Sequence, residues 1–541
     1  MDNYFVSSCK RVKDWICRQF GQKEKKTVHH KKFADGGEVI VWETGRAGEE
    51  AASYENLFLR KEIAGFRTNI RREQSCSIKS LTRDYLYKQL LSSGEYTFDH
   101  MLVIKDPYGE APLTALALFI LEEPACVRVT TKGNLKETDF VTELPKKKEH
   151  RVPILGMYAE KANDIVIEIL DDEGNCVKSH TFTIRTKRLP KSLRNVITVK
   201  KWTDKPAYSN IMINGGVKIH TCVFDIEGEI RYYLSRKPRG YGIFPLSDGH
   251  FFYMEKYISV PSYSNPQTVE SYDMDYFGRV FRTYLTEKGV HHTAEEKAGG
   301  NILTGSNSML EHTEDCVIEI DRQTGEIVWQ LNMAEIFDET YQDMMDWCHV
   351  NSAAYYEKDR TILISLRNVH AVICVDYDTK KLRWILSDPK FWEGTKMTPY
   401  LLQPEGDVKW CYQQHAAFEI ALPGESNPQK KRIIVYDNHW AKRRKAKSFD
   451  KDPLSYVSFY DIDEEKKTVS LHKRFAGPKT RIRANGIYVP DKKRVYNMAG
   501  SYAEPVDGDG GGIFEYDYET GEVLSEFGVK PGFFRAYPFE P

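Results

Sequence analysis

The stretch Ile318-Glu319-Ile320-Asp321-Arg322-Gln323-Thr324-Gly325-Glu326-Ile327-Val328-Trp329 decides the fold class of this chain. It predicts two β-strands joined by a tight turn, because an apolar run ends in an aspartate, turn residues with a glycine follow, and a second apolar run returns. Weaker copies of the pattern occur five more times, at residues 223–230, 271–280, 374–384, 459–469 and 515–523. Six such hairpins in one chain predict an all-β protein.

The spacing of these hairpins indicates how they are arranged. From Asp225 to Asp273 and on to Asp517, the aspartates that end the first strand of each copy are 48, 48, 55, 85 and 56 residues apart. A blade of a β-propeller repeats every 40 to 50 residues or so, and loops inserted into some blades lengthen the interval. We therefore predict a six-bladed β-propeller over residues 191–541.

Two further regions are predicted before the propeller. Residues 75–190 contain short β-type runs separated by turn residues, which indicates a small antiparallel β-sandwich; the runs are residues 100–104, 115–121, 126–131, 164–169 and 180–184. Residues 1–74 are predicted to form a helical, polar arm, because apolar residues between positions 4 and 20 approximate an amphipathic stripe that a basic stretch follows.

The charge balance and the hydropathy pattern exclude several classes of partner. The 541 residues include 77 lysines and arginines and 78 aspartates and glutamates, so the formal net charge is −1. We expect no nucleic-acid and no membrane partner, because the chain lacks the broad positive field that such binding needs and its longest apolar stretch, residues 111–121, is too short to span a bilayer. Residues 1–24 lack the apolar core of a secretory signal, and the ten cysteines include no Cys-x-x-Cys pair, so we expect a cytoplasmic protein with reduced thiols.

Three histidine-bearing segments precede predicted propeller strands. They are Val290-His291-His292-Thr293, Trp347-Cys348-His349-Val350-Asn351 and Gln413-Gln414-His415-Ala416-Ala417. The innermost strand of each blade lines the channel, so polar residues at these positions point towards a common axis from different blades. A single histidine before a strand is more often a surface or capping residue, but its recurrence in three segments favours a shared functional site.

These segments resemble those of bacterial arylsulfate sulfotransferases, which transfer sulfate between phenols without the nucleotide donor PAPS. The matching motifs are Asp346-Trp347-Cys348-His349-Val350-Asn351-Ser352, Ile364-Ser365-Leu366-Arg367-Asn368 and Gln414-His415-Ala416-Ala417-Phe418. Asp106-Pro107-Tyr108-Gly109-Glu110-Ala111-Pro112-Leu113-Thr114-Ala115 looks like the signature of that family's first domain. The resemblance covers most of residues 75–541 and leaves the first 70 residues unexplained.

The resemblance implies a role for each matching residue. His415 would be the nucleophile that is transiently sulfated, and four residues would surround the sulfuryl group: His292, His349, Asn351 and Arg367. His292 fits the family pattern better than His291, because it lies nine residues before the following strand, and His291 is kept as a substrate-binding candidate. The family also has a hydroxyl residue near the sulfate in its last blade, for which Thr480 is available.

Tyr108 is a further substrate-binding candidate outside the three segments. It lies in the turn Asp106-Pro107-Tyr108-Gly109 and could form an aromatic lip for a phenolic ring. A purely structural turn residue is an equally good interpretation.

The proposed chemistry is consistent with the residue types. A neutral imidazole, with an ordinary pKa of about 6.5, is a competent nucleophile near pH 7, and Arg367 supplies a permanent cation with a planar set of donors. Phenols have a pKa of about 10, so the leaving oxygen needs a proton donor and the incoming oxygen a base, roles that His292 or His349 could fill. No metal and no cofactor are required. Three histidines could still bind zinc, but Arg367 in the same cluster would repel a cation.

Other functions remain open from the sequence. The segment that ends in Trp329, and Trp384 in the next copy, resemble the docking motif of quinoprotein propellers, but no acidic cluster for the Ca²⁺ of such enzymes is evident. A non-catalytic interaction scaffold would not need histidines at three channel positions. Cys348 beside His349 could suggest a Cys/His nucleophile, but neighbours on an extended strand point to opposite faces, which favours a packed thiol. The expected partners are therefore small aryl sulfates and phenols, with a homodimer as a further possibility.

Overall fold

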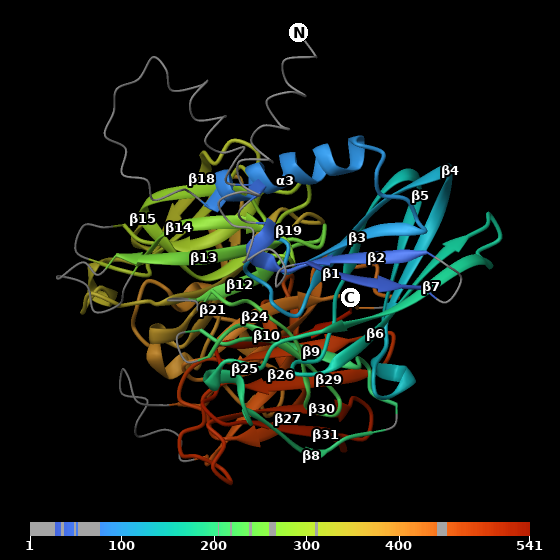
Figure 1. The fold of residues 1–541 in the computed structure, drawn as a ribbon. Coiled ribbons are helices and arrows are strands. Elements are labelled where there is room, and N and C mark those ends of the chain that lie inside the picture. The colour runs from blue at the N-terminus through green and yellow to red at the C-terminus, as the bar shows by residue number, and fades with distance from the viewer. Residues whose placement is uncertain are drawn as a thin grey trace, which may run out of the picture.

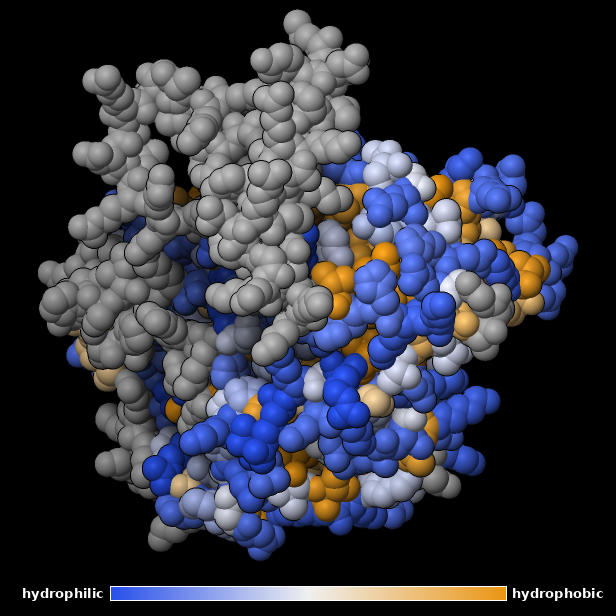
Figure 2. Space-filling view, viewed as in Figure 1, coloured by the Kyte–Doolittle hydropathy of each residue, from blue (hydrophilic) through white to orange (hydrophobic). Residues whose placement is uncertain are grey.

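The fold of the chain is seen in a computed structural model (Figure 1). The structure describes residues 28–540 apart from 34–36, 48–49, 52–75, 204, 217–218, 237–240, 259–266, 309–311, 423 and 441–451. Strands dominate the described residues, as the sequence predicts. None of the helices among them has the length and apolar character needed to cross a bilayer. Figure 2 shows that the described part of one face is mainly hydrophilic.

The strands before residue 190 form one seven-stranded sheet. Its order is β1-β2-β3-β4-β6-β7, with β5 paired to β4. The bounds are β1 Val28–Lys32, β2 Glu38–Trp42, β3 His100–Lys105, β4 Ala115–Thr131, β5 Phe140–Ile154, β6 Ala162–Leu170 and β7 Cys176–Arg185. Helix α3 (Cys76–Ser92) lies against β4 and β15, and η2 (Lys136–Thr138) and η3 (Lys191–Leu193) are short 3-10 turns. Every β run predicted in this region is part of a strand, and the runs at 115–121 and 126–131 are two halves of β4.

Two expectations for this region need correction. The predicted sandwich is not confirmed as two separate sheets, because hydrogen bonds join all seven strands, although the sheet folds over so that Phe33, next to β1, packs against Phe182 of β7 with ring centroids 6.3 Å apart. Residues 28–32 and 38–42, predicted to be in a helical arm, are strands, because the apolar run of β2 is buried and pairs in parallel with β3. The predicted stripe between residues 4 and 20 lies outside the described residues, and the domain boundaries after residues 74 and 190 remain predictions.

The remaining strands form five sheets in a propeller-like arrangement. Four have the size of a blade: β11-β10-β9-β32, β19-β20-β21-β22, β23-β27-β26-β25-β24 and β28-β29-β30-β31-β8. The fifth contains β12 to β18 in sequence order. The strand bounds are β8 Ile197–Lys201, β9 Asn210–Asn214, β10 Cys222–Asp225, β11 Ile230–Tyr233, β12 Gly242–Pro245, β13 Phe251–Ile258, β14 Gln267–Met274, β15 Val280–Glu296, β16 Ile302–Ser306, β17 Cys316–Ile320, β18 Ile327–Asn332, β19 Val350–Tyr356, β20 Thr361–Leu366, β21 Ala371–Asp376, β22 Leu382–Leu386, β23 Gln403–Pro404, β24 His415–Ile420, β25 Lys430–Asp437, β26 Leu454–Asp463, β27 Thr468–Pro478, β28 Asn485–Val489, β29 Arg494–Ala499, β30 Gly511–Asp517, β31 Val523–Val529 and β32 Arg535–Phe539. Five 3-10 turns connect them: η4 Met333–Glu335, η5 Glu339–Tyr341, η6 Arg367–Val369, η7 Pro389–Phe391 and η8 Thr398–Tyr400.

The count of six separate blades is wrong, although all six predicted hairpins are present. The hairpins are β10–β11, β14–β15, β17–β18, β21–β22, β26–β27 and β30–β31. Four sheets have blade size, because the hairpins at 271–280 and 318–329 share the seven-stranded sheet. The physical reason is β15, a single 17-residue strand that pairs with β14 along its first part and with β16 along its last part.

Both ends of the propeller region are held by pairing across the chain. β8 completes the sheet of β31, and β32 completes the sheet of β9, so the first and last strands are each hydrogen bonded to a distant segment. Strands β15, β19, β24, β28 and β32 contact one another in that order. This row of adjacent strands brings the three histidine segments together.

Candidate active site

Each of the three histidine segments contains a β-bulge. The pairing register shifts between His291 and Ala294 on β15, between Val350 and Ser352 on β19, and between His415 and Ala417 on β24. A bulge adds one residue to one strand and turns a side chain out of the regular alternation. The same local irregularity therefore directs side chains from three strands towards one place.

The backbone at these bulges is strained. His292 has a φ of 59°, His349 a φ of 56° and Ala416 a φ of 67°, all in the left-handed region. For a residue with a Cβ this conformation costs on the order of 1 kcal/mol. Repeated strain of this kind at adjacent strands is typical of functional sites, where the surrounding fold maintains it.

His349 lies between two carboxylates. Its Nδ1 is 2.8 Å from Oδ2 of Asp346 and 2.6 Å from Oε2 of Glu314. Burial alone would lower the pKa of His349, but Asp346 and Glu314 together raise it from 6.5 to about 9. His349 is therefore an imidazolium at neutral pH, and its Nε2 is the nitrogen left for a ligand.

His292 lies beside His349 but is neutral, whereas His349 is positively charged. The two ring centroids are 4.7 Å apart, and the ring of Tyr241 is 4.2 Å from that of His292. Burial lowers the pKa of His292 well below its usual value, against the attraction of Glu314, and the positive charge of His349 lowers it further. Tyr241 also donates a hydrogen bond of 3.1 Å to Oε1 of Glu314.

His415 is buried and has a defined partner at each ring nitrogen. Nδ1 is 2.8 Å from Oδ1 of Asn438, and the main-chain N–H of Arg483 lies 3.3 Å from Nε2. Burial, followed by the charge of Arg367, lowers the pKa of His415 well below its usual value. The side chain is therefore a neutral imidazole in a cationic surrounding.

Arg367 and Asn351 border the same cluster. Arg367 begins η6, its main-chain N–H donates to the carbonyl of His349 at 3.1 Å, and its Nη1 donates to Oδ1 of Asn368. Asn351 is fully buried and donates through Nδ2 to the carbonyl of Gln414 at 2.7 Å, which ties β19 to the segment before His415. The structure thus brings together five of the predicted residues: His292, His349, His415, Arg367 and Asn351.

A comparison with known proteins identifies the family. The family model "Arylsulfotransferase (ASST)" matches residues 195–535, more than half of the chain. The chain belongs to the arylsulfotransferase family. A second model, "Arylsulfotransferase Ig-like domain", matches residues 102–187, and these findings confirm the resemblance seen in the motifs.

Curated relatives agree with this arylsulfotransferase assignment. The chain is 23% identical to the arylsulfate sulfotransferase AssT of Escherichia coli O6:H1, with 79% of this chain and 90% of the relative covered. It is 22% identical to the AssT of Lelliottia amnigena over the same shares. Among solved structures, a protein of unknown function from Bacteroides caccae is similar with a TM-score of 0.40 and 11% identity, covering 62% of this chain and all of that one. The chain is accordingly an enzyme of the arylsulfotransferase family.

Three other residues singled out in the sequence have different surroundings. His291 is fully buried, its Nε2 lies 2.8 Å from the carbonyl oxygen of Ser306, and its Nδ1 faces Nδ1 of His292 at 3.2 Å, so its contacts are with the protein itself. Thr480 is fully buried next to Asn438 and behind His415. Cys348 is packed in the core, where burial raises the pKa of its thiol well above the usual value, which does not favour a thiolate nucleophile.

The expectation that Tyr108 borders the substrate is not supported. Its hydroxyl donates a hydrogen bond of 2.5 Å to Asp84 of α3, and its ring packs against Tyr87 and Phe277. The turn that contains Tyr108 is covered by α3, which the sequence pattern did not predict. Tyr108 therefore anchors this helix and has no contact with the histidine cluster among the contacts of the described residues.

Several residues around the candidate site were missed in the sequence, namely Tyr241, Glu314, Asn438 and Arg535, the last of which donates through Nη2 to the carbonyl of Asn351 at 2.7 Å. Asp346 was predicted only as part of a matching motif, without a role of its own, whereas it pairs with His349. One signal could have identified Asn438: an asparagine follows the second strand in Ser306-Asn307, Arg367-Asn368 and Asp437-Asn438. Tyr241, Glu314 and Arg535 have no such local signal, because they approach the site from distant parts of the chain.

One group of described residues could hold a metal ion. The ligand atoms of His292, Glu314 and His349 lie within 4.8 Å of one another. However, Nδ1 of His349 already forms ion pairs with Glu314 and Asp346, so a cation would have to displace a proton from this imidazolium. The charge distribution therefore favours an anionic ligand over a metal.

Proposed function

We propose that this protein transfers a sulfuryl group from an aryl sulfate to a phenol without PAPS, through a sulfohistidine at His415. The observation that carries the proposal is the combination of a neutral, buried His415 with two neighbouring cations, Arg367 and the His349 imidazolium. Nucleophile and cations are the two components that this reaction needs, since sulfuryl transfer is governed by positioning and charge stabilisation, as phosphoryl transfer is. The curated relatives carry the name of this activity.

In the first half-reaction, the lone pair on Nε2 of His415 attacks the sulfur of the aryl sulfate. The bond between sulfur and the phenolic oxygen breaks, and its electron pair stays on that oxygen. His349 gives its Nε2 proton to the leaving oxygen, so the first phenol departs neutral and His349 becomes neutral. As sulfur takes up the lone pair of His415, the main-chain N–H of Arg483, which lies 3.3 Å from Nε2 in the structure, is released to the sulfuryl oxygens, and together with Arg367 it stabilises them.

In the second half-reaction, another phenol takes the place of the first. Neutral His349 accepts its proton, the phenolate attacks the sulfur, and the bond to Nε2 breaks with its electron pair returning to His415. The enzyme is then in its initial state, with His349 again an imidazolium. In these two steps His349 is the acid and then the base, a role that the amino-acid sequence left open between His292 and His349. His292 remains neutral beside it.

The test uses p-nitrophenyl sulfate as donor and phenol as acceptor. The proposal expects nitrophenol release that depends on the acceptor with parallel double-reciprocal plots, and a protein mass that increases by one SO₃ group when the donor is added alone. His415→Ala should abolish both, and His472→Gln, a change of a histidine on β27 away from the cluster, should abolish neither. Full turnover by His415→Ala would overturn the nucleophile assignment, and absence of release by the unmodified protein with any aryl sulfate would overturn the proposed activity.

A further inference from the structure

Behind His415 lies a chain of buried polar side chains. Asn438 is between His415 and Thr480: its Oδ1 is 2.8 Å from Nδ1 of His415, and its Nδ2 is 2.8 Å from Oγ1 of Thr480. Ser455 completes the chain, with its Oγ 3.0 Å from Oγ1 of Thr480 and 2.8 Å from the carbonyl oxygen of Asn438. Asn438, Thr480 and Ser455 are all fully buried.

The hydrogen atoms of this chain can be assigned by elimination. The carbonyl oxygen of Asn438 can only accept, so the hydroxyl of Ser455 donates to it. The single hydrogen of the Thr480 hydroxyl then goes to Ser455 at 3.0 Å or to the hydroxyl of Tyr436 at 3.4 Å. In either case Thr480 accepts from Nδ2 of Asn438, which turns Oδ1 towards His415. Since Oδ1 is an acceptor only, Nδ1 of His415 carries the proton and Nε2 carries the lone pair.

The opposite end of the His415 ring supports the same assignment independently. The main-chain N–H of Arg483 points at Nε2, and a main-chain N–H can only donate. Nε2 must therefore be the acceptor nitrogen. Two separate elements, the Asn438 chain and the Arg483 main chain, thus agree on one tautomer.

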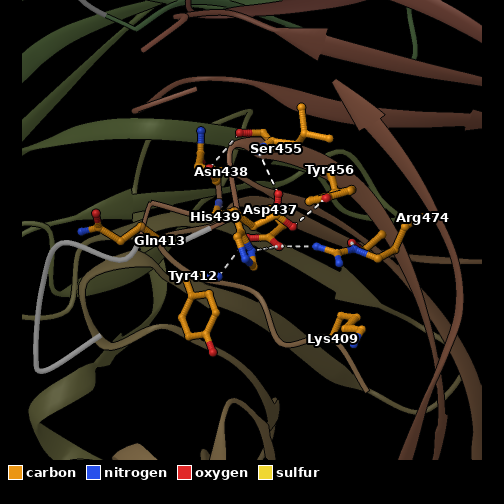
Figure 3. A network of polar contacts seen from close by, with 12 residues as sticks. Lys409, Tyr412, Gln413, Asp437, Asn438, His439, Ser455, Tyr456 and Arg474 are labelled. Atoms are coloured by element: carbon orange, nitrogen blue, oxygen red, sulfur yellow. Dashed lines mark hydrogen bonds and ion pairs between the residues drawn. The ribbon is translucent and has the colours of Figure 1, made fainter. Parts of the chain in front are cut away.

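The position of Asn438 is fixed by its neighbour Asp437 (Figure 3). The fully buried carboxylate of Asp437 accepts hydrogen bonds from the main-chain N–H groups of Tyr412 and His439, at 2.9 and 2.8 Å. It also pairs with Nδ1 of His439 at 2.7 Å and with Arg474 at 3.2 Å. Asp437 therefore ties the end of β25 to the segment that leads into His415.

We infer that Asn438 is a positioning residue that keeps the proton on Nδ1 of His415 throughout the sulfuryl transfer; this inference rests on the proposed function. After attack by Nε2 the sulfohistidine retains the Nδ1 proton, so its ring carries a positive charge that the negative charge of the attached sulfonate balances. Departure of the imidazole then returns an electron pair to a positively charged ring, which leaves more easily than a neutral one. The Nδ1 proton moves in neither half-reaction, so it is neither gained nor lost in the balance of the cycle.

The neutral amide of Asn438 suits this role better than a carboxylate would. Among the described residues, Arg367, His349 and Arg535 are charged groups that lower the pKa of His415, so all three oppose a positive charge on its ring before the donor binds. An aspartate at position 438 would favour the imidazolium and so remove the nucleophilic lone pair at neutral pH. The amide oxygen of Asn438 fixes the tautomer of His415 without favouring the protonated ring.

The first test compares Asn438→Ala with Asn438→Asp. Loss of a residue that orients a reacting imidazole costs about 10- to 100-fold by analogy with ligand-orienting residues, so we expect Asn438→Ala to lower kcat by that factor with little change in KM. Asn438→Asp restores an acceptor, so it should recover activity at high pH, with the acidic limb of kcat/KM displaced upward by about 1 to 2 pH units. The matched control is Asn427→Asp, before β25, where Oδ1 accepts from the main-chain N–H of Gln429, a hydrogen bond that a carboxylate keeps, so the profile should be unchanged.

A second measurement does not depend on turnover. In the NMR spectrum of protein labelled with ¹⁵N-histidine, the signals of His415 are identified by their loss in His415→Gln. In the wild type they should show a protonated Nδ1 and an unprotonated Nε2, and in Asn438→Ala they should show a mixture of the two tautomers. Thr480→Val, which keeps the side-chain shape but removes the acceptor for Nδ2, should give a similar mixture if Asn438→Ala does not fold. A wild-type His415 protonated at Nε2, or equal pH profiles for the Ala and Asp variants, would overturn the inference. Absence of sulfate transfer by the wild type would instead overturn the proposed function, and the spectrum would still report the tautomer.

Discussion

Replacing Asp346 by asparagine tests the assignment of His349 as the acid and base. Asp346 is the first of the two carboxylates that raise the pKa of His349 from 6.5 to about 9, and Glu314 is the second. A rise of this size stabilises the imidazolium by about 3 kcal/mol, at 1.36 kcal/mol per pKa unit. Asp346→Asn keeps the shape and removes one of the two charges, so the pKa of His349 should fall by about one unit.

The consequence is a displaced alkaline limb of the pH profile. In the wild type, activity should decline as pH rises through about 9, where His349 loses its proton. With a pKa near 8 in Asp346→Asn, kcat/KM should be about threefold lower at pH 8.5 and about eightfold lower at pH 9.5, with a change of only about 10% at pH 7. The assay is nitrophenol release from p-nitrophenyl sulfate between pH 6 and 10, quantified after adjustment to a single pH.

The same shift has a stability consequence with a defined sign. A histidine whose pKa is raised in the folded state stabilises the fold fully below its unfolded pKa of 6.5, and this contribution is lost as pH rises towards about 9. The difference in free energy of unfolding between wild type and Asp346→Asn should therefore be largest near pH 6 and vanish above pH 9. Asp343→Asn, at an exposed position three residues earlier, is the control. An alkaline limb that stays in place in Asp346→Asn would refute the role of His349 as the proton donor.

Two further predictions concern Tyr108 and the possible metal ligands His292, Glu314 and His349. Tyr108→Phe loses the hydrogen bond to Asp84, so it should lower the free energy of unfolding, measured in urea, by about 1 kcal/mol and leave kcat/KM unchanged. A fall in kcat/KM at unchanged stability would instead indicate that Tyr108 contacts the substrate. Dialysis against EDTA should leave nitrophenol release unchanged, because Arg367 and His349 supply the positive charge, and a loss of activity that added Zn²⁺ restores would show that His292, Glu314 and His349 hold a required metal.

The part of the fold that depends on local pattern could be predicted from the sequence. All six hairpins are present, because alternating apolar residues and an aspartate-containing turn determine a hairpin within about a dozen residues. Four of these turns contain a glycine, and the other two have Lys380 and Lys467 in the left-handed region instead. The division into sheets could not be predicted. β15 continues through Gly289, which has a φ of 71° and would ordinarily indicate a break, because β14 and β16 pair with it on either side of that glycine.

The same distinction applies to the site. His292, His349 and His415 could be found because each lies at the start or bulge of an inner strand in a repeated position. Glu314 could not be found in this way, because it contacts His349 from the segment before β17 and the residues around it in the sequence form no motif. The tautomer of His415 depends on Asn438, Thr480 and Ser455, which are brought together only by the pairing of β25, β26 and β27.

Under the proposed function, the charges around the candidate site would suit a monoanionic ligand, although the net charge of the chain is nearly zero. Three cations, Arg367, Arg535 and the His349 imidazolium, lie near two carboxylates, Glu314 and Asp346. Burial raises the pKa of the neighbouring Glu295 to about 7, so that carboxyl adds only a partial charge. An excess of about one positive charge in a buried site is costly without a partner, and one aryl sulfate compensates it. A dianion such as an aryl phosphate would leave a buried negative charge in its place. Under the proposed function, the same cations that keep His415 neutral would therefore also favour an aryl sulfate over an aryl phosphate.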